Sequence, residues 1–148
     1  MAQIDRSTID FLKELEGVMY KAYDDGAGFM TIGVGHLIKP NEQHLLTAEL
    51  DNVDVDSLLF QDLRTFEIAL KKLVDVKKLT QGQFNALISF AFNVGESALA
   101  KSTLLKKVIA KAPRKEIEAE FLKWNKASGK VMQGLTNRRK KEIKMYFS

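Results

Sequence analysis

The sequence predicts an α+β protein, mostly α, with a small N-terminal β-hairpin lobe joined by a long helix to a helical C-terminal lobe. Apolar residues recur at helical spacing in most of the chain, and a single Gly-rich segment, residues 20–38, carries the aromatic and β-branched residues typical of strands. The 148 residues are 45% hydrophobic and 28% charged, which favours one folded domain over disorder. The expected parts are an N-terminal lobe over about 8–55, a connecting helix over about 56–74 and a helical lobe over about 79–148.

The N-terminal lobe is expected to begin with a helix over residues 8–16. Ser7 or Thr8 can cap this helix, and Gly17 can end it. The strand-forming segment that follows is broken by the turn at residues 24–28, which predicts a hairpin. After a polar stretch, Asp56 can cap the connecting helix.

The sequence predicts a series of helices in the C-terminal part. Thr80 and Gln83 form a capping box for a helix that stops at Gly95. Further helices are expected over 102–111, over 114–124 with Pro113 in the first turn, and over 136–146. A cleft between the two lobes would be the usual place for a ligand.

Composition excludes several classes of site. The chain has no Cys, so disulfides, thiolate nucleophiles and Cys-based zinc sites are excluded, and with only 2 His no metal site is expected. The longest uncharged stretch, residues 79–95, is interrupted by polar side chains, so we expect no integral membrane contact. Charged residues within the first ten positions speak against an export signal, and the expected place of synthesis is a cytoplasm.

Charge is unevenly divided along the chain. Residues 1–100 contain 9 Lys or Arg and 15 Asp or Glu, whereas residues 101–148 contain 14 and 4. A basic surface attracts polyanions such as nucleic acid, anionic lipid or an acidic wall polymer. Composition does not choose among them, and a merely solvated surface explains the same pattern.

Carboxylates are the remaining candidates for chemistry. In the first helix Glu14 lies opposite the apolar stripe, whereas Glu16 lies on its edge and is expected to be partly buried. A partly buried carboxylic acid can stay protonated and donate its proton near neutral pH. A surface glutamate at a helix end is the plainer interpretation of position alone.

The second strand of the predicted hairpin has two unlike faces. Alternation places Thr31 with Gly33 and Gly35 on one nearly bare face, and Ile32, Val34 and His36 on the other. Glycines in a strand mark close approach by a ligand or another segment, so the bare face beside Asp25 could receive a sugar ring. A loose edge strand is the alternative, and His36 suits a hydrogen-bonded structural role.

The order and spacing of these residues resemble the phage-type lysozymes of glycoside hydrolase family 24. Residues 16–36 match the catalytic segment, with Glu16, Asp25, Thr31 and a Thr-Ile-Gly-x-Gly-His run at the family's spacing. Further similarity covers nearly the whole chain, at residues 59–63, 79–95, 102–105, Trp124 and 134–139. It is weakest over residues 41–58, so contacts at the rim of a cleft are not transferred there.

The resemblance implies a lysozyme-like fold and hydrolysis of the β-1,4 bond between N-acetylmuramic acid and N-acetylglucosamine in peptidoglycan. It makes Glu16 the general acid, and Asp25 with Thr31 the holder of the attacking water in an inverting reaction. Leu37 and Phe92 match substrate-cleft positions, and His36 with Asp62 a structural pair joining the hairpin to the long helix. Arg138 and Arg139 match the C-terminal helix, with a structural or wall-binding role.

The resemblance implies no cofactor and no metal. It further implies a monomer whose partner is the glycan strand of peptidoglycan and not nucleic acid. The protein would wait in the host cytoplasm until it is released to the cell wall or periplasm, where it lyses the host.

Three rival functions stay open at this point. A non-catalytic wall-binding relative would use residues 101–148, and a nucleic-acid binder would use the same basic part without a recognisable module. A lytic transglycosylase would need one glutamate and neither Asp25 nor Thr31, and its anhydromuramyl product would distinguish it.

Overall fold

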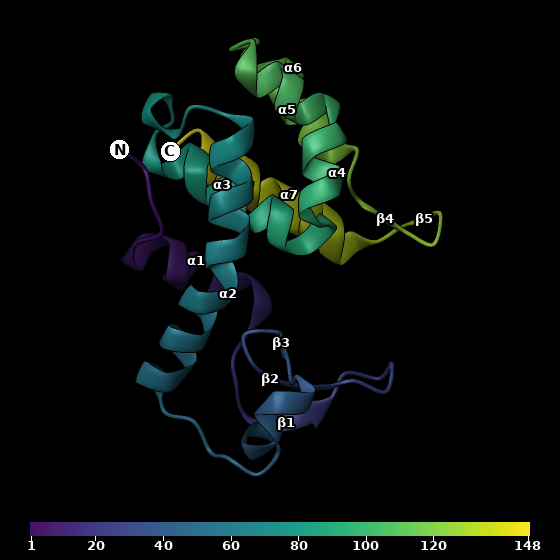
Figure 1. The fold of residues 1–148 in the computed structure, drawn as a ribbon. Coiled ribbons are helices and arrows are strands. Elements are labelled where there is room, and N and C mark those ends of the chain that lie inside the picture. The colour runs from purple at the N-terminus through teal and green to yellow at the C-terminus, as the bar shows by residue number, and fades with distance from the viewer. The chain divides into compact units, whose positions relative to one another are not determined.

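The computed structural model describes all 148 residues, and it is mostly helical with a small antiparallel sheet near the N-terminus, as predicted (Figure 1). The chain forms two compact units. The N-terminal unit is Ile4–Thr65, and the C-terminal unit combines Met1–Gln3 with Phe66–Ser148. None of the helices combines the length and the hydropathy of a membrane-spanning segment.

The first helix, α1, spans Arg6–Glu16 and starts two residues before the predicted start. Its N-cap is Asp5 and not Ser7 or Thr8, because the Asp5 carboxylate accepts hydrogen bonds from the backbone N–H groups of both residues. Thr8 closes the capping box by accepting from the Asp5 backbone N–H. The helix ends before Gly17, as predicted, where φ is +76°.

The hairpin segment forms three strands where the sequence predicted two: β1 (Met19–Asp24), β2 (Met30–Gly33) and β3 (His36–Leu37), in the order β1-β2-β3. Gly33 and Gly35 have φ of +68° and +67°, so the chain reverses direction after β2. The predicted alternation therefore does not continue through Val34 and Gly35. Ile32 still shares a face with His36, because the two are paired across β2 and β3.

Between the sheet and the long helix lies the 3₁₀ segment η1 (Pro40–Leu46). Helix α2 then spans Asn52–Leu73 and begins four residues before the predicted Asp56 cap. The reason is a reciprocal pair of bonds at the helix start: Asp51 accepts from the Asp54 N–H at 2.8 Å, and Asp54 accepts from the Asp51 N–H at 3.1 Å. Asp56 therefore does not cap the helix, and its carboxylate accepts hydrogen bonds from Arg6 and Lys13 instead.

The C-terminal unit is built around α3 (Gln81–Val94), which follows the short 3₁₀ segment η2 (Val76–Lys78). Thr80 and Gln83 form the predicted capping box, and Gly95 ends the helix. Every residue from 84 to 91 is buried. Phe90 makes edge-to-face contacts with Phe121 and Trp124, with ring centroids 5.9 Å and 5.3 Å apart.

The remaining helices are α4 (Glu96–Lys101), α5 (Thr103–Ile109), α6 (Arg114–Leu122) and α7 (Gln133–Tyr146), and α7 packs against α3 (Figure 1). The sequence did not predict α4, and it placed the start of α5 one residue early. Ser102 separates the two helices: its hydroxyl donates to the Leu99 carbonyl and accepts from the Leu105 N–H.

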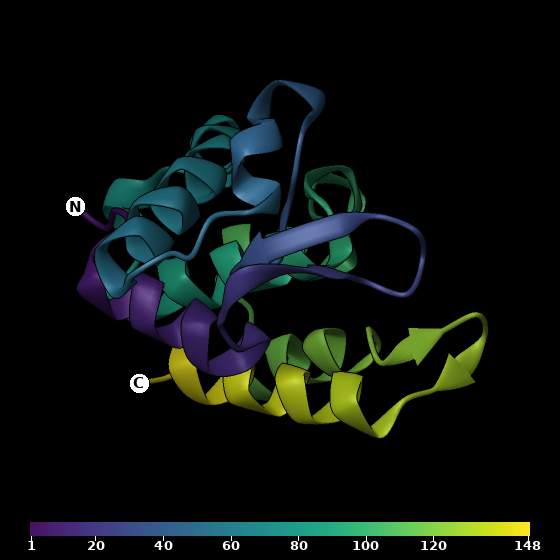
Figure 2. The same ribbon diagram turned by 90° about the horizontal axis from the view of Figure 1, so that it is seen from below.

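A second hairpin, β4 (Lys126–Ala127) with β5 (Lys130–Val131), was not predicted. Figure 2 shows it extending beyond the helices of the C-terminal unit. Its turn is formed by Ser128 and Gly129, both at positive φ. This two-residue Ser-Gly turn was the available signal in the sequence.

Candidate active site

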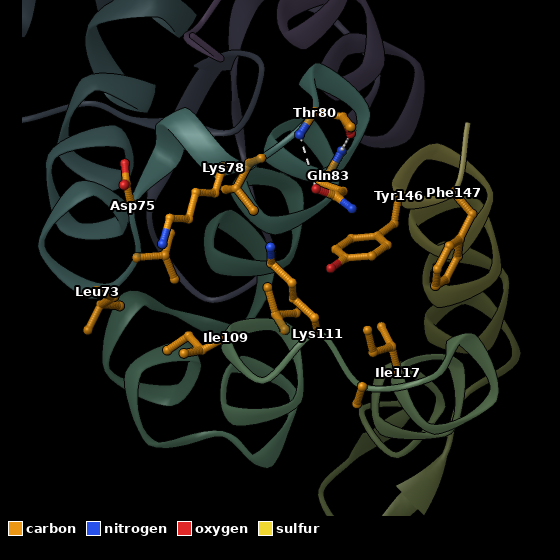
Figure 3. A pocket seen from close by; sticks show the side chains of 14 residues that line it. Leu73, Asp75, Lys78, Thr80, Gln83, Ile109, Lys111, Ile117, Tyr146 and Phe147 are labelled. Carbon is orange, nitrogen blue, oxygen red and sulfur yellow. Dashed lines mark hydrogen bonds between the residues drawn. The ribbon is translucent and has the colours of Figure 1, made fainter.

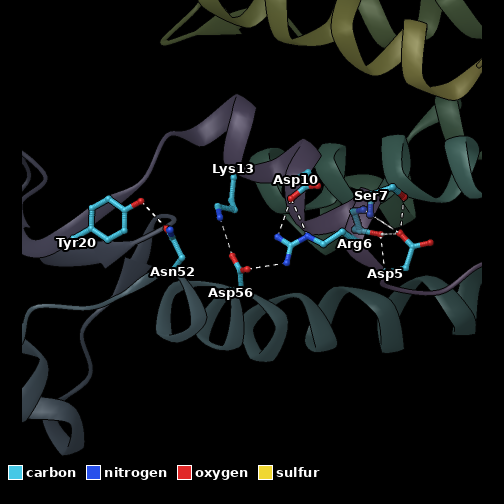
Figure 4. A network of polar contacts seen from close by, with 9 residues as sticks. Asp5, Arg6, Ser7, Asp10, Lys13, Tyr20, Asn52 and Asp56 are labelled. Atoms are coloured by element: carbon cyan, nitrogen blue, oxygen red, sulfur yellow. Dashed lines mark hydrogen bonds and ion pairs between the residues drawn. The ribbon is translucent and has the colours of Figure 1, made fainter.

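Helix α1, which ends at Glu16, is tied to α2 inside the N-terminal unit by a polar network around Asp56 (Figure 4). Asp56 accepts hydrogen bonds from Arg6 at 2.8 Å and from Lys13 at 2.9 Å. The bond from Arg6 lowers the pKa of Asp56 below its ordinary value, and the bond from Lys13 acts in the same direction against the effect of burial. Asp56 therefore stays ionised and fixes the helix that ends at Glu16.

Strand β1 is attached to the start of the same long helix. The Tyr20 hydroxyl donates to Asn52 Oδ1 at 2.7 Å (Figure 4), and the Leu50 N–H donates to the Tyr20 carbonyl at 2.9 Å. Helix α1 and the sheet are thus held by neighbouring turns of one helix.

Glu16 is the last residue of α1, and its side chain is exposed, like that of Glu14. The predicted partial burial of Glu16 is therefore wrong. The helix stops at this position, so no following turn covers the carboxyl group, and Gly17 has no side chain.

Asp25 lies at the start of the loop between β1 and β2, where its carboxylate is held through one oxygen only. Oδ1 accepts from the N–H groups of Ala27 at 2.8 Å and Phe29 at 3.2 Å. The Asp25 N–H donates to the Phe29 carbonyl, which closes the loop at 3.0 Å. No hydrogen bond is made to Oδ2, so the carboxylate is oriented while one oxygen can accept a proton or a hydrogen bond from a ligand.

Thr31 lies in β2, across the hairpin from Asp25, which directly follows β1. The register pairs Tyr23 with Thr31 and the loop bond pairs Asp25 with Phe29, so Asp25 and Thr31 are diagonal neighbours across β1 and β2. Thr31 is 3% exposed, and its hydroxyl has no hydrogen-bond partner. A buried hydroxyl without a partner is uncommon and points to a functional role.

The other predicted site residues lie in different places. Leu37 pairs with Thr31 across β3 and is 53% exposed, so it stands on the same face as Thr31. Phe92 is half-buried in α3 of the C-terminal unit, with its ring edge-on to Phe66 at 5.6 Å. Gly33, by contrast, packs near a protein side chain: a Cβ added to it would lie 3.5 Å from Leu58 Cδ2.

His36 is 4% exposed and lies between two carboxylates. Its Nδ1 is 2.8 Å from Asp62, and its Nε2 is 2.9 Å from Glu42. Burial alone would lower the pKa of His36, but the hydrogen bonds to Glu42 and Asp62 raise it above its ordinary value. Glu42 was missed in the sequence because it lies in the stretch of weakest family similarity.

Arg138 and Arg139 are buried in the C-terminal unit, Arg139 completely. Arg139 contacts Glu142 at 2.7 Å, and Ser89 donates to Glu142 at 2.6 Å. These arginines therefore have the structural role that was one of the two expected, and neither presents its charge for wall binding. No group of three or more His, Asp or Glu side chains is arranged to hold a metal ion.

Comparison with known proteins agrees with this arrangement. The sequence model of the phage lysozyme family matches residues 13–142. The endolysin of Salmonella phage P22 is 40% identical over 149 residues, which cover all of both chains. The endolysin of Bacillus phage B103 is 38% identical over 147 residues, and this chain spans only 54% of that relative's length.

A solved structure is similar over its whole length. The crystal structure of a P22 lysozyme mutant superposes with a TM-score of 0.88 at 36% identity, covering 100% of both chains. The fold is therefore that of a lysozyme, a mostly helical α+β protein with a small N-terminal sheet. Within that class, the chain belongs to the phage lysozyme family.

Proposed function

We propose that this chain is an endolysin that lyses the host by hydrolysing β-1,4 bonds between N-acetylmuramic acid and N-acetylglucosamine in peptidoglycan. The observation that carries the proposal is the family match across residues 13–142, which includes Glu16, Asp25 and Thr31. The chain spans about half the length of the Bacillus phage relatives, so the proposal concerns the glycosidase alone.

In the proposed reaction Glu16 is the general acid that protonates the leaving glycosidic oxygen. Its exposed position at the end of α1 leaves the carboxyl group accessible to a polymer substrate. Asp25 and Thr31 hold the attacking water on the opposite face of the sugar, and Asp25 accepts its proton. The anchoring of Asp25 through Oδ1 supports this role, because Oδ2 is left for the water.

Leu37 and Phe92 are proposed to contact the sugar rings, and His36 with Asp62 to support the sheet. The proposed partner is the glycan strand, bound by a monomer without nucleic acid or a cofactor. The protein would be made in the host cytoplasm and reach the wall after the membrane is opened.

The test is product analysis on purified peptidoglycan with Glu16→Gln and, as the matched control, Glu14→Gln on the same helix. Both side chains are exposed, and circular dichroism checks that both variants fold. Glu16→Gln should lose at least about 10²–10⁴-fold in rate because the proton donor is removed, whereas Glu14→Gln should retain the wild-type rate.

Mass spectrometry of the wild-type products distinguishes hydrolysis from the reaction of a lytic transglycosylase. Hydrolysis leaves a reducing N-acetylmuramic acid, whereas a transglycosylase leaves the anhydro sugar. Anhydro products, or full activity of folded Glu16→Gln protein, would show that the proposed mechanism is wrong.

A further inference from the structure

The C-terminal unit contains a cavity of about 560 Å³ that the proposed glycosidase reaction does not use. It is formed where η2 and the start of α3 meet the ends of α5 and α7 and the side of α6 (Figure 3). Its walls are mainly apolar, with Leu79, Val108 and Ile117 among the lining residues. This volume lies in the range of small-molecule sites.

Two lysines place positive charge at this apolar cavity. Lys78 and Lys111 line the cavity and are both exposed, and neither forms an ion pair in the structure. Figure 3 shows the ammonium group of Lys111 on the side of Tyr146 and that of Lys78 on the side of Leu73. Asp75 is the only carboxylate in the lining, and its Oδ1 is used to cap η2 by accepting from the Lys77 N–H. The cavity therefore has two cations without an anionic partner.

The other polar groups of the lining differ in whether they have a hydrogen bond available for a ligand. Thr80 and Gln83 satisfy each other in the capping box of α3. The Tyr146 hydroxyl makes no hydrogen bond to the protein, and Figure 3 shows it turned toward Lys111. It can therefore donate a hydrogen bond to an anion beside the lysines.

The backbone at Lys111 supports a role for its side chain. Lys111 has φ of +53° directly after the end of α5, in the left-handed region where glycine is the usual residue. A lysine in this conformation costs stability that a glycine would not, and such residues cluster at ligand sites.

We propose that this cavity binds a small anionic amphiphile, with its hydrocarbon body against the apolar walls and its carboxylate or phosphate head at Lys111 and Tyr146, where Lys78 adds positive charge. Apolar walls favour the hydrocarbon, and the two unpaired ammonium groups favour an anionic over a neutral or cationic head. The head group chemistry is shared by free fatty acids and by single-chain anionic phospholipids.

Binding is tested by calorimetry with decanoate below its micelle-forming concentration, beside decanol and decyltrimethylammonium as neutral and cationic analogues. Decanoate should bind at one site at least about tenfold more tightly than decanol, and the cation should not bind. Methyl NMR should place the ligand next to Leu79, Val108 and Ile117. A single-chain phosphatidylglycerol is measured in parallel to distinguish a phospholipid from a free fatty acid as the ligand. Tighter binding than decanoate would indicate a phospholipid, and weaker binding would indicate a free fatty acid.

The variant Lys111→Gly distinguishes a loss of ligand binding from a loss of stability, because it should change the two in opposite directions. It should raise Tm by about 2–4 °C because it removes the left-handed lysine, and it should weaken decanoate binding about tenfold. Ser128→Gly is the matched control: Ser128 also has positive φ, at 52°, but lies in the β4–β5 turn, so its replacement should raise Tm without affecting binding. Lys78→Met, which removes the second positive charge of the lining, should weaken binding to a smaller but measurable extent.

The outcomes are distinct. Saturable decanoate binding that is weakened in Lys111→Gly and, to a smaller extent, in Lys78→Met, and kept in Ser128→Gly, supports the proposal. Equal binding of decanoate and decanol, unchanged binding in the lysine variants, or no saturable binding of either anionic probe overturns it.

Discussion

Nδ1 of His36 lies 2.8 Å from Oδ2 of Asp62, which joins strand β3 to helix α2 inside the N-terminal unit. The imidazole is almost completely buried, and its second nitrogen contacts Glu42. Removing one partner would leave a desolvated charge or donor behind. Breaking a contact of this kind therefore costs more than breaking an exposed pair, which is worth about 0–1 kcal/mol.

The first prediction is a coupling between these two residues. His36→Asn and Asp62→Asn should each lower the free energy of unfolding by about 1–3 kcal/mol, and the double variant should lose less than the sum. Denaturant unfolding of the four proteins measures the coupling. Additive losses would mean that the contact contributes nothing of its own to stability.

The same pair should make stability depend on pH. The pKa of His36 is raised in the folded protein by Glu42 and Asp62, so its stabilising contribution is complete below the ordinary histidine value of 6.5 and is lost as pH rises through the folded value. The His36→Asn variant should accordingly lose more stability at pH 6 than at pH 9. Tm measured across this range, with His44→Asn as an exposed control, tests the sign.

The sequence was most informative where local signals act alone. The capping box of Thr80 and Gln83 and the stop at Gly17 are confirmed, because caps and helix stops depend on neighbouring residues. The first cap was misplaced because Asp5, Ser7 and Thr8 are all good capping residues, and only the geometry chooses among them.

Contacts between residues that are distant in the chain limited what could be predicted from the sequence. The sequence predicts Asp56 as a helix cap, whereas in the structure it pairs with Arg6 and Lys13, which are distant in the chain and give no periodic signal. The exposure of Glu16 depends on the helix ending there. The catalytic assignment came from the family resemblance, because position alone favoured an ordinary surface glutamate.

The second prediction concerns Glu142, which is fully buried against Arg139 and Ser89. Burial raises the pKa of Glu142, and the neighbouring Arg139 opposes this by favouring the charged form. Glu142→Gln should cost about 3–5 kcal/mol because it leaves a buried guanidinium without its counter-charge. Glu118→Gln removes a more exposed pair with Arg114 and should change stability by less than about 1 kcal/mol, so equal losses would contradict the argument.

The third prediction tests the close approach of α3 and α7. A Cβ added to Gly82 would lie 2.4 Å from the Met145 backbone carbonyl, which leaves no room for it. Gly82→Ala should therefore destabilise the protein by about 1–3 kcal/mol, although alanine favours a helix. Gly134→Ala in α7 meets no atom within 4 Å and should be neutral or stabilising, and thermal unfolding of both variants measures the difference.

The fourth prediction concerns the basic C-terminal part and rests on the proposed function. Arg138 and Arg139 are buried, so attraction to an anionic wall must come from exposed lysines such as Lys140, Lys141 and Lys144. Attraction between exposed charges is screened over about 10 Å at 0.1 M salt. Lysis of whole walls should fall as salt approaches about 0.5 M, whereas cleavage of a short soluble oligosaccharide should change little.

A variant with Lys140, Lys141 and Lys144 replaced by Gln should lyse walls more slowly at low salt and respond less to added salt. If both substrates respond equally to salt, the lysines do not act through wall attraction.

The last prediction is the stereochemistry of the proposed reaction. Asp25 and Thr31 lie near each other across the β1–β2 hairpin, Asp25 is anchored through Oδ1, and the buried Thr31 hydroxyl has no protein partner. The proposal that these two residues hold a water, in place of direct attack by the carboxylate on the sugar, follows from the match to the phage lysozyme family. Attack by water inverts the anomeric centre, so the first product of a β-linked substrate should be the α-anomer.

Thr31→Ala should slow hydrolysis by about 10²-fold or more, whereas Thr31→Ser, which keeps the hydroxyl, should retain most of the rate. Proton NMR during the first turnovers identifies the anomer before it equilibrates. An initial β-anomer, or a covalent glycosyl ester on Asp25, would assign a retaining mechanism, in which the two carboxyl groups stand about 5–5.5 Å apart. The inverting reaction needs about 6.5–9.5 Å between them, because the water must fit between the carboxylate and the sugar.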